Sequence, residues 1–151
     1  MPRIRQLQTA HGVLESDEQR KAQTLASSER HVKDSEAKLA ELDKYREAYL
    51  RDFASRAGGG MTAARAREYQ AFLARLDEAL REQNEIVVRA REQRAELLSK
   101  WRGAAQHTAA VDRALQRGLT EEQRRGERRE QSDADERSQR RWSTAENRRV
   151  R

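Results

Sequence analysis

The 151-residue sequence contains no cysteine, and its only proline is Pro2. Without cysteine the chain can form neither a disulfide framework nor a thiolate metal site. The three histidines, His11, His31 and His107, lie far apart in the sequence and have no spacing typical of metal ligands. We therefore expect no metal site and no cofactor.

Long apolar runs are also missing from the chain. No stretch approaches the roughly 20 apolar residues needed to cross a bilayer, and the amino-terminal residues lack the hydrophobic region of a signal peptide. The mean hydropathy is -1.18. These features together predict a cytoplasmic protein.

Aromatic residues make up only 5% of the chain and hydrophobic residues 35%, whereas 38% of the residues are charged. This is too little apolar surface for a compact globular core. A long helix or coiled coil needs only a narrow apolar stripe, and disorder is the alternative that a high charge also favours. The spacing of the apolar residues decides between the two.

Charges of both signs are interleaved along the chain. Basic and acidic residues number 11 and 10 in residues 1–57, 11 and 8 in residues 58–118, and 10 and 8 in residues 119–151. Nucleic-acid-binding proteins usually gather their basic groups in a patch, because phosphate neutralisation depends on local contacts. We therefore expect no nucleic-acid partner, although the pI of about 10.1 leaves a basic nucleic-acid-binding coiled coil open as an alternative.

Apolar residues recur at alternating steps of three and four in both halves of the chain, which is the spacing of a heptad seam. In the first half these positions are Ile4, Leu7, His11, Leu14, Glu18, Lys21, Leu25, Ser28, Val32, Ser35, Leu39, Leu42, Arg46, Tyr49 and Phe53. In the second half they are Thr62, Ala66, Tyr69, Leu73, Leu76, Leu80, Gln83, Val87, Ala90, Arg94, Leu97, Trp101, Ala104, Thr108, Val111, Leu115 and Gly118. A disordered chain would not keep this phase for so long, so the pattern predicts two long helices.

The glycine-rich stretch "SRAGGGMTAAR" separates the two patterns. Because glycine reaches left-handed conformations, we predict that the chain reverses near residues 57–61, with Thr62 capping the second helix. The predicted fold is all-α, a two-helix antiparallel coiled-coil hairpin over residues 1–118 with an overhanging C-terminal helix. Residues 119–151 form this charged overhang, and their last part, residues 143–151, is expected to be disordered.

Folding the chain about its glycines pairs positions whose numbers sum to 118 or 119. This register places Tyr49 opposite Tyr69, and apolar residues face each other along most of the seam. In the middle, however, Leu25 would face Arg94, whose long stem can cover the seam while its charged head stays in water. We expect the loosest packing in that region.

A second apolar stripe runs beside the seam of the second helix. It consists of Phe72, Leu76, Ala79, Gln83 and Ile86. A single partner helix cannot cover both stripes, so the interface is either slightly wide or flanked by a docking surface near the turn. Tyr45, Tyr49 and Tyr69 would add amphipathic aromatic groups to such a surface.

Several stretches carry a family resemblance. The segments "KLAELDKYREAYLRDF" and "EYQAFLARLDEAL", the tryptophan in "LLSKWR" and the tail pattern "ERREQSDADERSQRR" follow one another along the chain. Their order, the position of the loop and the total length resemble the FliJ family of flagellar type III export proteins. The resemblance covers most of the chain and implies a coiled coil similar to the stalk subunit of rotary ATPases.

The resemblance also implies partners. Proteins of this family insert their paired terminal region into the pore of the hexameric export ATPase FliI, contact the cytoplasmic part of the export gate protein FlhA and recycle export chaperones. This implies a peripheral association with the inner membrane through the export apparatus. Carried over by position, the export-gate contacts are Leu42, Tyr45, Tyr49, Phe72, Leu76, Ala79 and Gln83. The contacts with the ATPase ring are Arg128, Gln131, Asp135, Glu136 and Arg140.

The sequence offers no set of residues suited to catalysis. The stretch "AGGGMTAAR" lacks the lysine and the serine or threonine of a Walker loop. Acidic pairs such as Asp77 and Glu78 are typical of a solvated helix face. We therefore predict a binding protein rather than an enzyme. A stalk protein of a virulence-type secretion system and a purely structural coiled-coil scaffold remain alternatives.

Overall fold

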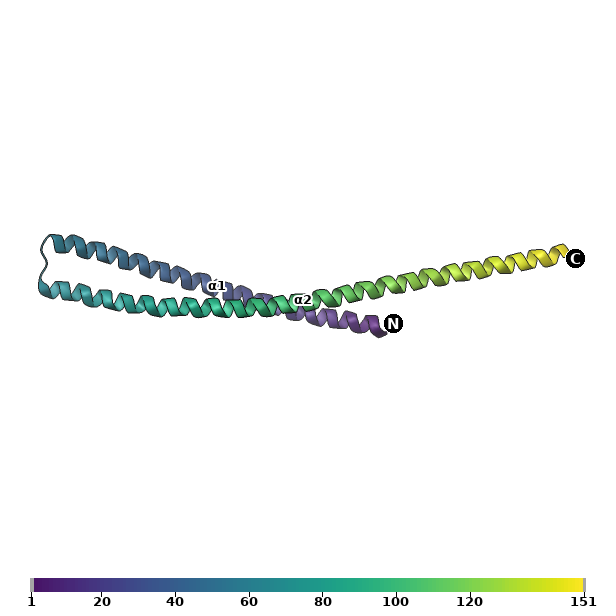
Figure 1. Cartoon of the computed structure of the whole chain (residues 1–151), viewed down its shortest axis with the longest axis horizontal. Coiled ribbons are helices and arrows are strands. Elements are labelled where there is room, and N and C mark those ends of the chain that lie inside the picture. Colours follow the sequence, from purple (N-terminus) through teal and green to yellow (C-terminus); the bar gives the residue numbers. More distant parts are fainter. Residues whose placement is uncertain (1, 151) are drawn as a thin grey trace. The chain divides into compact units, whose positions relative to one another are not determined.

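The computed structural model describes residues 2–150, which form two α-helices joined by a short turn (Figure 1). Helix α1 spans Pro2–Gly58 and helix α2 spans Ala63–Val150. The described residues contain no β-strand. The two helices pack against each other in opposite directions, so the predicted all-α hairpin is confirmed.

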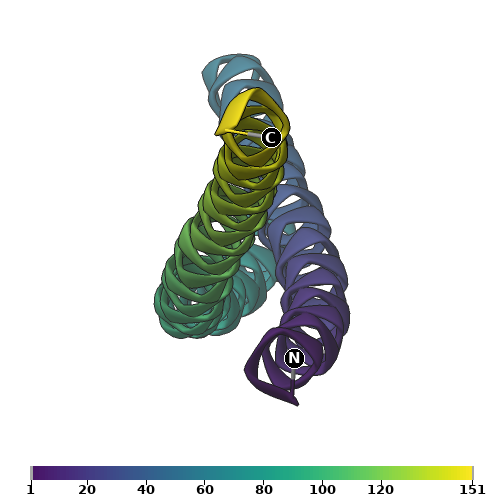
Figure 2. The same ribbon diagram turned by 90° about the vertical axis from the view of Figure 1, so that its right-hand side faces the viewer.

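Packing contacts divide the described chain into two units. The terminal unit comprises residues 2–16 of α1 and residues 105–150 of α2, whereas the turn unit comprises Asp17–Ala104. Each unit therefore contains one segment of α1 and one segment of α2. In the terminal unit, the purple start of α1 and the yellow end of α2 are separate ribbons when viewed toward the chain ends (Figure 2).

The turn between the helices uses the conformational freedom of glycine at one position. Gly60 has a φ of +93°, which residues with a side chain rarely adopt. The backbone N–H of Gly59 donates a hydrogen bond to the carbonyl oxygen of Arg56 at 3.2 Å, which satisfies a carbonyl group at the end of α1. Thr62 Oγ1 accepts a hydrogen bond from the backbone N–H of Arg65 at 3.2 Å, so the predicted cap of α2 is confirmed.

The predicted heptad positions form the interface between the helices. Every seam position in residues 4–53 and 66–118 is buried or half-buried, and only the capping residue Thr62 is exposed. The most deeply buried side chains are Val32 and Val87, with exposed fractions of 2% and 1%. The period of 3.5 residues in the sequence therefore identifies the core of the hairpin.

Two contacts in the turn unit follow the predicted register. The rings of Tyr49 and Tyr69 lie 4.9 Å apart, and Gln83 Nε2 donates a hydrogen bond to the carbonyl oxygen of Ser35 at 3.0 Å. In the middle of the seam, where the sequence predicts the loosest packing, Leu25 is only 8% exposed, whereas Lys21, Arg94 and Leu97 are half-buried. The methylene groups of a long polar side chain can cover an apolar neighbour and exclude water from it.

The overhanging part of α2 has a different character. All residues in 119–150 are exposed, in contrast to the paired residues before them. Residues 143–150 are helical, although the sequence suggested disorder there. This segment contains neither proline nor glycine and includes Ala145, Glu146, Arg148 and Arg149, which favour helix. Thr144 Oγ1 donates a hydrogen bond to the carbonyl oxygen of Arg140 at 2.9 Å. Arg151, which also belongs to the predicted disordered tail, lies outside the described residues.

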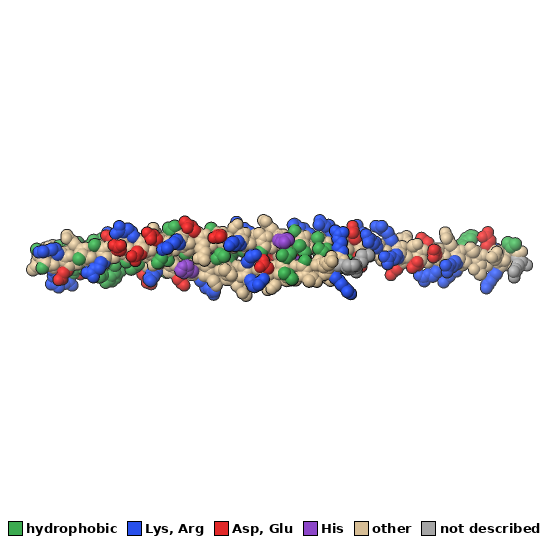
Figure 3. All heavy atoms as spheres, turned by 90° about the horizontal axis from the view of Figure 1, so that it is seen from below, with side chains coloured by type: hydrophobic (Ala, Val, Ile, Leu, Met, Phe, Trp, Pro, Cys, Tyr) green, Lys and Arg blue, Asp and Glu red, His purple; other side chains and the backbone are tan. Residues whose placement is uncertain are grey.

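Positive and negative side chains are interspersed on the face of the molecule seen in Figure 3. This is the pattern expected of solvated helices whose apolar groups are confined to a narrow seam. Within residues 2–150, neither helix contains a stretch apolar enough to cross a membrane.

Candidate docking surfaces

Five aromatic rings gather beside the turn, and we call them the aromatic cluster. The cluster consists of Tyr45, Tyr49 and Phe53 from α1 and Tyr69 and Phe72 from α2. Tyr49 lies at its centre, with its ring 4.9 Å from that of Tyr69 and 4.5 Å from that of Phe72. The ring of Tyr45 meets Phe72 edge-on at 6.1 Å. These separations are typical of favourable contacts between aromatic side chains.

The cluster is buried on one side and open to solvent on the other. Tyr69 is only 9% exposed, whereas Tyr45 is 53% exposed. Tyr49 and Phe72 are half-buried between them. The cluster therefore presents rigid aromatic groups to the outside, held in place by rings that belong to the hairpin interface.

A polar network supports the buried side of the cluster. The Tyr69 hydroxyl group donates a hydrogen bond to Asp52 Oδ2 at 2.8 Å, and Arg56 Nε donates one to Asp52 Oδ1 at 3.2 Å. The hydrogen bond from Tyr69, followed by that from Arg56, holds the pKa of Asp52 below its ordinary value. The same contact with Asp52 raises the pKa of Tyr69. This network fixes the Tyr69 ring at the junction of the two helices.

The structure separates the seven export-gate residues implied by the resemblance into two groups. Leu42, Tyr45, Tyr49, Phe72 and Ala79 keep part of their surface accessible. Leu76 and Gln83, by contrast, are only 7% and 6% exposed and belong to the interface between the helices. Ile86, which continues the same stripe on α2, is 38% exposed.

The other flank of the turn unit is polar. Arg46 Nε lies 2.6 Å from Asp77 Oδ1 and forms an ion pair between α1 and α2. A shallow hollow nearby is lined by Leu39, Asp43, Leu80, Arg81, Asn84 and Glu85. At about 100° per residue, Asp43 lies roughly 160° around α1 from Tyr45, so the two flanks differ in chemistry.

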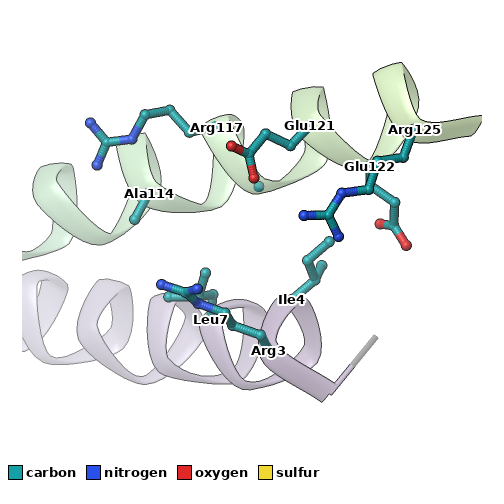
Figure 4. Close-up of a pocket in the computed structure, with 9 residues that line it drawn as sticks. Arg3, Ile4, Leu7, Ala114, Arg117, Glu121, Glu122 and Arg125 are labelled. Carbon is teal, nitrogen blue, oxygen red and sulfur yellow. The ribbon is translucent and has the colours of Figure 1, made fainter. Parts of the chain in front are cut away.

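The terminal unit has a pocket where the pairing of the helices ends (Figure 4). Its lining residues are Arg3, Ile4, Leu7, Ala114, Arg117, Gly118, Glu121, Glu122 and Arg125. Gly118 has no side chain, and a Cβ atom there would lie 3.7 Å from Ile4 Cγ1. Between the α1 and α2 segments of the described terminal unit, the only close approach of a basic side chain to a carboxylate is that of His11 Nε2 to Asp112 Oδ1, at 3.5 Å. The pairing in this unit therefore depends mainly on the seam, in which Leu115 is only 8% exposed.

The five ATPase-ring residues implied by the resemblance are all exposed on the overhang. At about 100° per residue, Arg128, Gln131 and Asp135 lie within about 60° of one another around α2. Glu136 and Arg140 are one helical turn apart on a different face. The structure therefore brings these residues onto one helix but distributes them over two of its faces.

The charge of the overhang changes sign along its length, which the overall charge balance of residues 119–151 does not reveal. Residues 119–136 contain four arginines and seven acidic residues, whereas residues 137–150 contain five arginines and one acidic residue. A shorter counting window would have revealed this change of sign from the sequence alone. The end of α2 is thus a basic segment that follows an acidic one.

The chain matches a known protein family. The family model described as "Flagellar FliJ protein" matches residues 3–147 of the 151-residue chain. The match includes both helices, the turn and most of the overhang. The searches of curated proteins and of solved structures give no match.

Proposed function

Because the chain belongs to the FliJ family of flagellar proteins, we propose that it is a coiled-coil coupling component of the type III export apparatus, linking the export ATPase to the export gate. Membership of the family means a non-enzymatic role in flagellar protein export. A coupling role is more specific than a role in export, and it depends on two surfaces at different places in the chain.

The first surface is the open side of the aromatic cluster, and it is the observation that carries the proposal. Tyrosine and phenylalanine side chains that are already ordered by their neighbours lose little conformational entropy when they bind. Tyr45 is 53% exposed, and Tyr49 and Phe72 support it from both helices. We propose that this surface binds the cytoplasmic part of the export gate protein FlhA.

The second surface belongs to the terminal unit. Its overhang is an unpaired helix of about 48 Å, as the rise of 1.5 Å per residue predicts for residues 119–150. A single helix with an exposed surface on all sides is suited to insertion into a ring of subunits. We propose that the overhang and the paired residues next to it engage the pore of the hexameric export ATPase FliI.

The proposed role includes recycling of export chaperones and a peripheral position at the inner membrane. In this proposal the chain acts by binding, and its long helices transmit a mechanical or conformational signal between partners. Attachment to the membrane would then come through the gate protein rather than through the chain itself.

The proposal is tested by mixing the purified full-length chain with the export ATPase and, separately, with the cytoplasmic part of the export gate. We expect ring assembly and faster ATP hydrolysis in the first mixture, and saturable binding in the second. Failure of both reactions would contradict the coupling role. An excess of duplex DNA serves as a control, because a nucleic-acid-binding coiled coil would be titrated away from both partners.

A further inference from the structure

The end of α2 concentrates positive charge that nothing in the hairpin requires. Residues 137–150 contain five arginines and only one acidic residue, Glu146. Like charges at neighbouring helix positions repel one another and slightly destabilise the helix. The segment is fully exposed, so the charges do not support any packing of α1 on α2.

Most of these arginines share one face of the helix, which we call the arginine face. The arginine face consists of Arg137, Arg140, Arg141 and Arg148. Arg140, Arg141 and Arg148 lie three, four and eleven residues after Arg137. At about 100° per residue, all four lie within about 100° of one another around the helix axis. Three of them line a shallow hollow together with Thr144 and Ala145.

The arginine face has no carboxylate partner among residues 2–150. None of the ion pairs formed by the described side chains includes an arginine of this face. Arg137 Nε donates only to the backbone carbonyl oxygen of Asp133, at 3.4 Å. Glu146 lies on the opposite side of the helix, roughly 180° from Arg137. The guanidinium groups are therefore available to a ligand.

We infer that the arginine face binds a compact acidic surface on a protein partner. This inference rests on the proposed function and assigns a chemistry to the part of the ATPase ring that meets the overhang. Guanidinium groups pair with carboxylates, as with phosphates, through two parallel hydrogen bonds, so a row of arginines can bind clustered aspartate and glutamate side chains.

A protein surface fits these observations better than a membrane. A helix that lies in a membrane interface needs a continuous apolar face beside its basic one. The large apolar side chains of this segment are Trp142 and Val150 alone, and Trp142 is roughly 140° around the helix from Arg137. The segment has no such apolar face.

A protein surface also fits better than a nucleic acid. The arginine face extends over only about 17 Å of helix. Glu130 and Asp133 follow on the same side of α2, toward the turn of the hairpin. A phosphate backbone that continued along the helix would meet these carboxylates, whereas a short acidic loop would not.

Two triple variants of the full-length chain test this inference. The first, Arg137→Gln/Arg141→Gln/Arg148→Gln, removes charge from the arginine face. The second removes the same charge from exposed arginines of the turn unit and is the matched control. It combines Arg75→Gln, Arg89→Gln and Arg102→Gln. Circular dichroism should show the same helicity for both, because all six positions are exposed.

Affinity for the export ATPase is measured for each variant at low and at high salt. We expect the arginine-face variant to bind at least tenfold more weakly at low salt, with a weaker salt dependence than the unchanged chain, because screened charge pairs have been removed. The control should stay within threefold. Equal losses in the two variants would overturn the inference, because they would indicate a general effect of net charge.

A second set of probes separates this inference from the proposed function. Poly-glutamate, duplex DNA and vesicles containing phosphatidylserine are titrated against the same three proteins. If the unchanged chain does not bind the ATPase, the proposed function fails. The arginine face is still supported if its variant alone loses poly-glutamate binding. It is overturned if DNA or vesicles bind the face more tightly than poly-glutamate does.

Discussion

The hydroxyl group of Tyr69 on α2 donates a 2.8 Å hydrogen bond to Asp52 Oδ2 on α1. This bond joins the two helices beside the turn and holds the Tyr69 ring 5.2 Å from Phe53 and 4.9 Å from Tyr49. A surface polar contact thus sets the position of the buried ring on which the aromatic cluster rests.

The Tyr69→Phe variant tests this contact through pH. The pKa of Asp52 is lowered, first by the bond from Tyr69 and then by Arg56, so it should rise toward its ordinary value in the variant and be measurable by NMR. An aspartate with a lowered pKa in the folded state stabilises the fold above the ordinary value of about 3.9, and this contribution is lost as the pH falls through the lowered value. The difference in stability between the two proteins should therefore be present at pH 7 and vanish in strong acid. A difference that does not depend on pH would assign the effect to packing.

The Tyr45→Ala variant tests whether the aromatic cluster is a docking surface. Tyr45 is 53% exposed, so its truncation should change the free energy of unfolding by less than about 0.5 kcal/mol. Its affinity for the export gate should fall at least tenfold, since interface tyrosines often contribute more than about 1.4 kcal/mol. Val88→Ala is the matched control, because Val88 is 44% exposed on α2 and lies outside the cluster. Equal gate affinities in the two variants would remove Tyr45 from the interface.

The Ser28→Ala variant should stabilise the protein, which is unusual for a buried position. Ser28 is 8% exposed, and its hydroxyl oxygen has no hydrogen-bond partner among the described residues. Alanine removes this unsatisfied group and has a higher helix propensity, so we expect a gain of about 0.5–1 kcal/mol in urea denaturation. A loss of stability would indicate that the hydroxyl group is hydrogen-bonded in solution.

Two glycine substitutions should have opposite effects. A Cβ atom at Gly103, inside α2, would meet no atom within 4 Å, so Gly103→Ala should raise the free energy of unfolding by about 0.5–1 kcal/mol. Gly60 has a φ of +93° in the turn, and Gly60→Ala should cost about 1–2 kcal/mol because of backbone strain. Thermal unfolding measures both. A stabilising Gly60→Ala variant would mean that the turn adopts another conformation.

The sequence was sufficient to predict the helices and their seam. The heptad period depends only on which residues are apolar, and one continuous phase led from Ile4 to Phe53 and another from Ala66 to Gly118. The turn was predictable for a similar reason, because three consecutive glycines have few other uses in a chain of good helix formers.

The details of the docking surfaces were less predictable. Leu76 and Gln83 belong both to the seam and to the second stripe, and the sequence left open whether that stripe widens the interface or forms a docking surface. Both side chains are buried in the interface. Gln83 reaches the backbone of Ser35, a contact that side-chain periodicity cannot reveal. The pairing of Asp52 with Tyr69 likewise depends on how the two helices are rotated about their axes, which the heptad pattern fixes only approximately.

The most direct test of the coupling role measures ATP hydrolysis by the export ATPase with the full-length chain and with a chain truncated after Gly118. The truncated chain keeps the seam and the aromatic cluster, so it should remain helical and bind the export gate with unchanged affinity. We predict that the full-length chain stimulates hydrolysis and that the truncated chain does not. Equal stimulation by the two chains would contradict the assignment of the overhang to the ATPase ring.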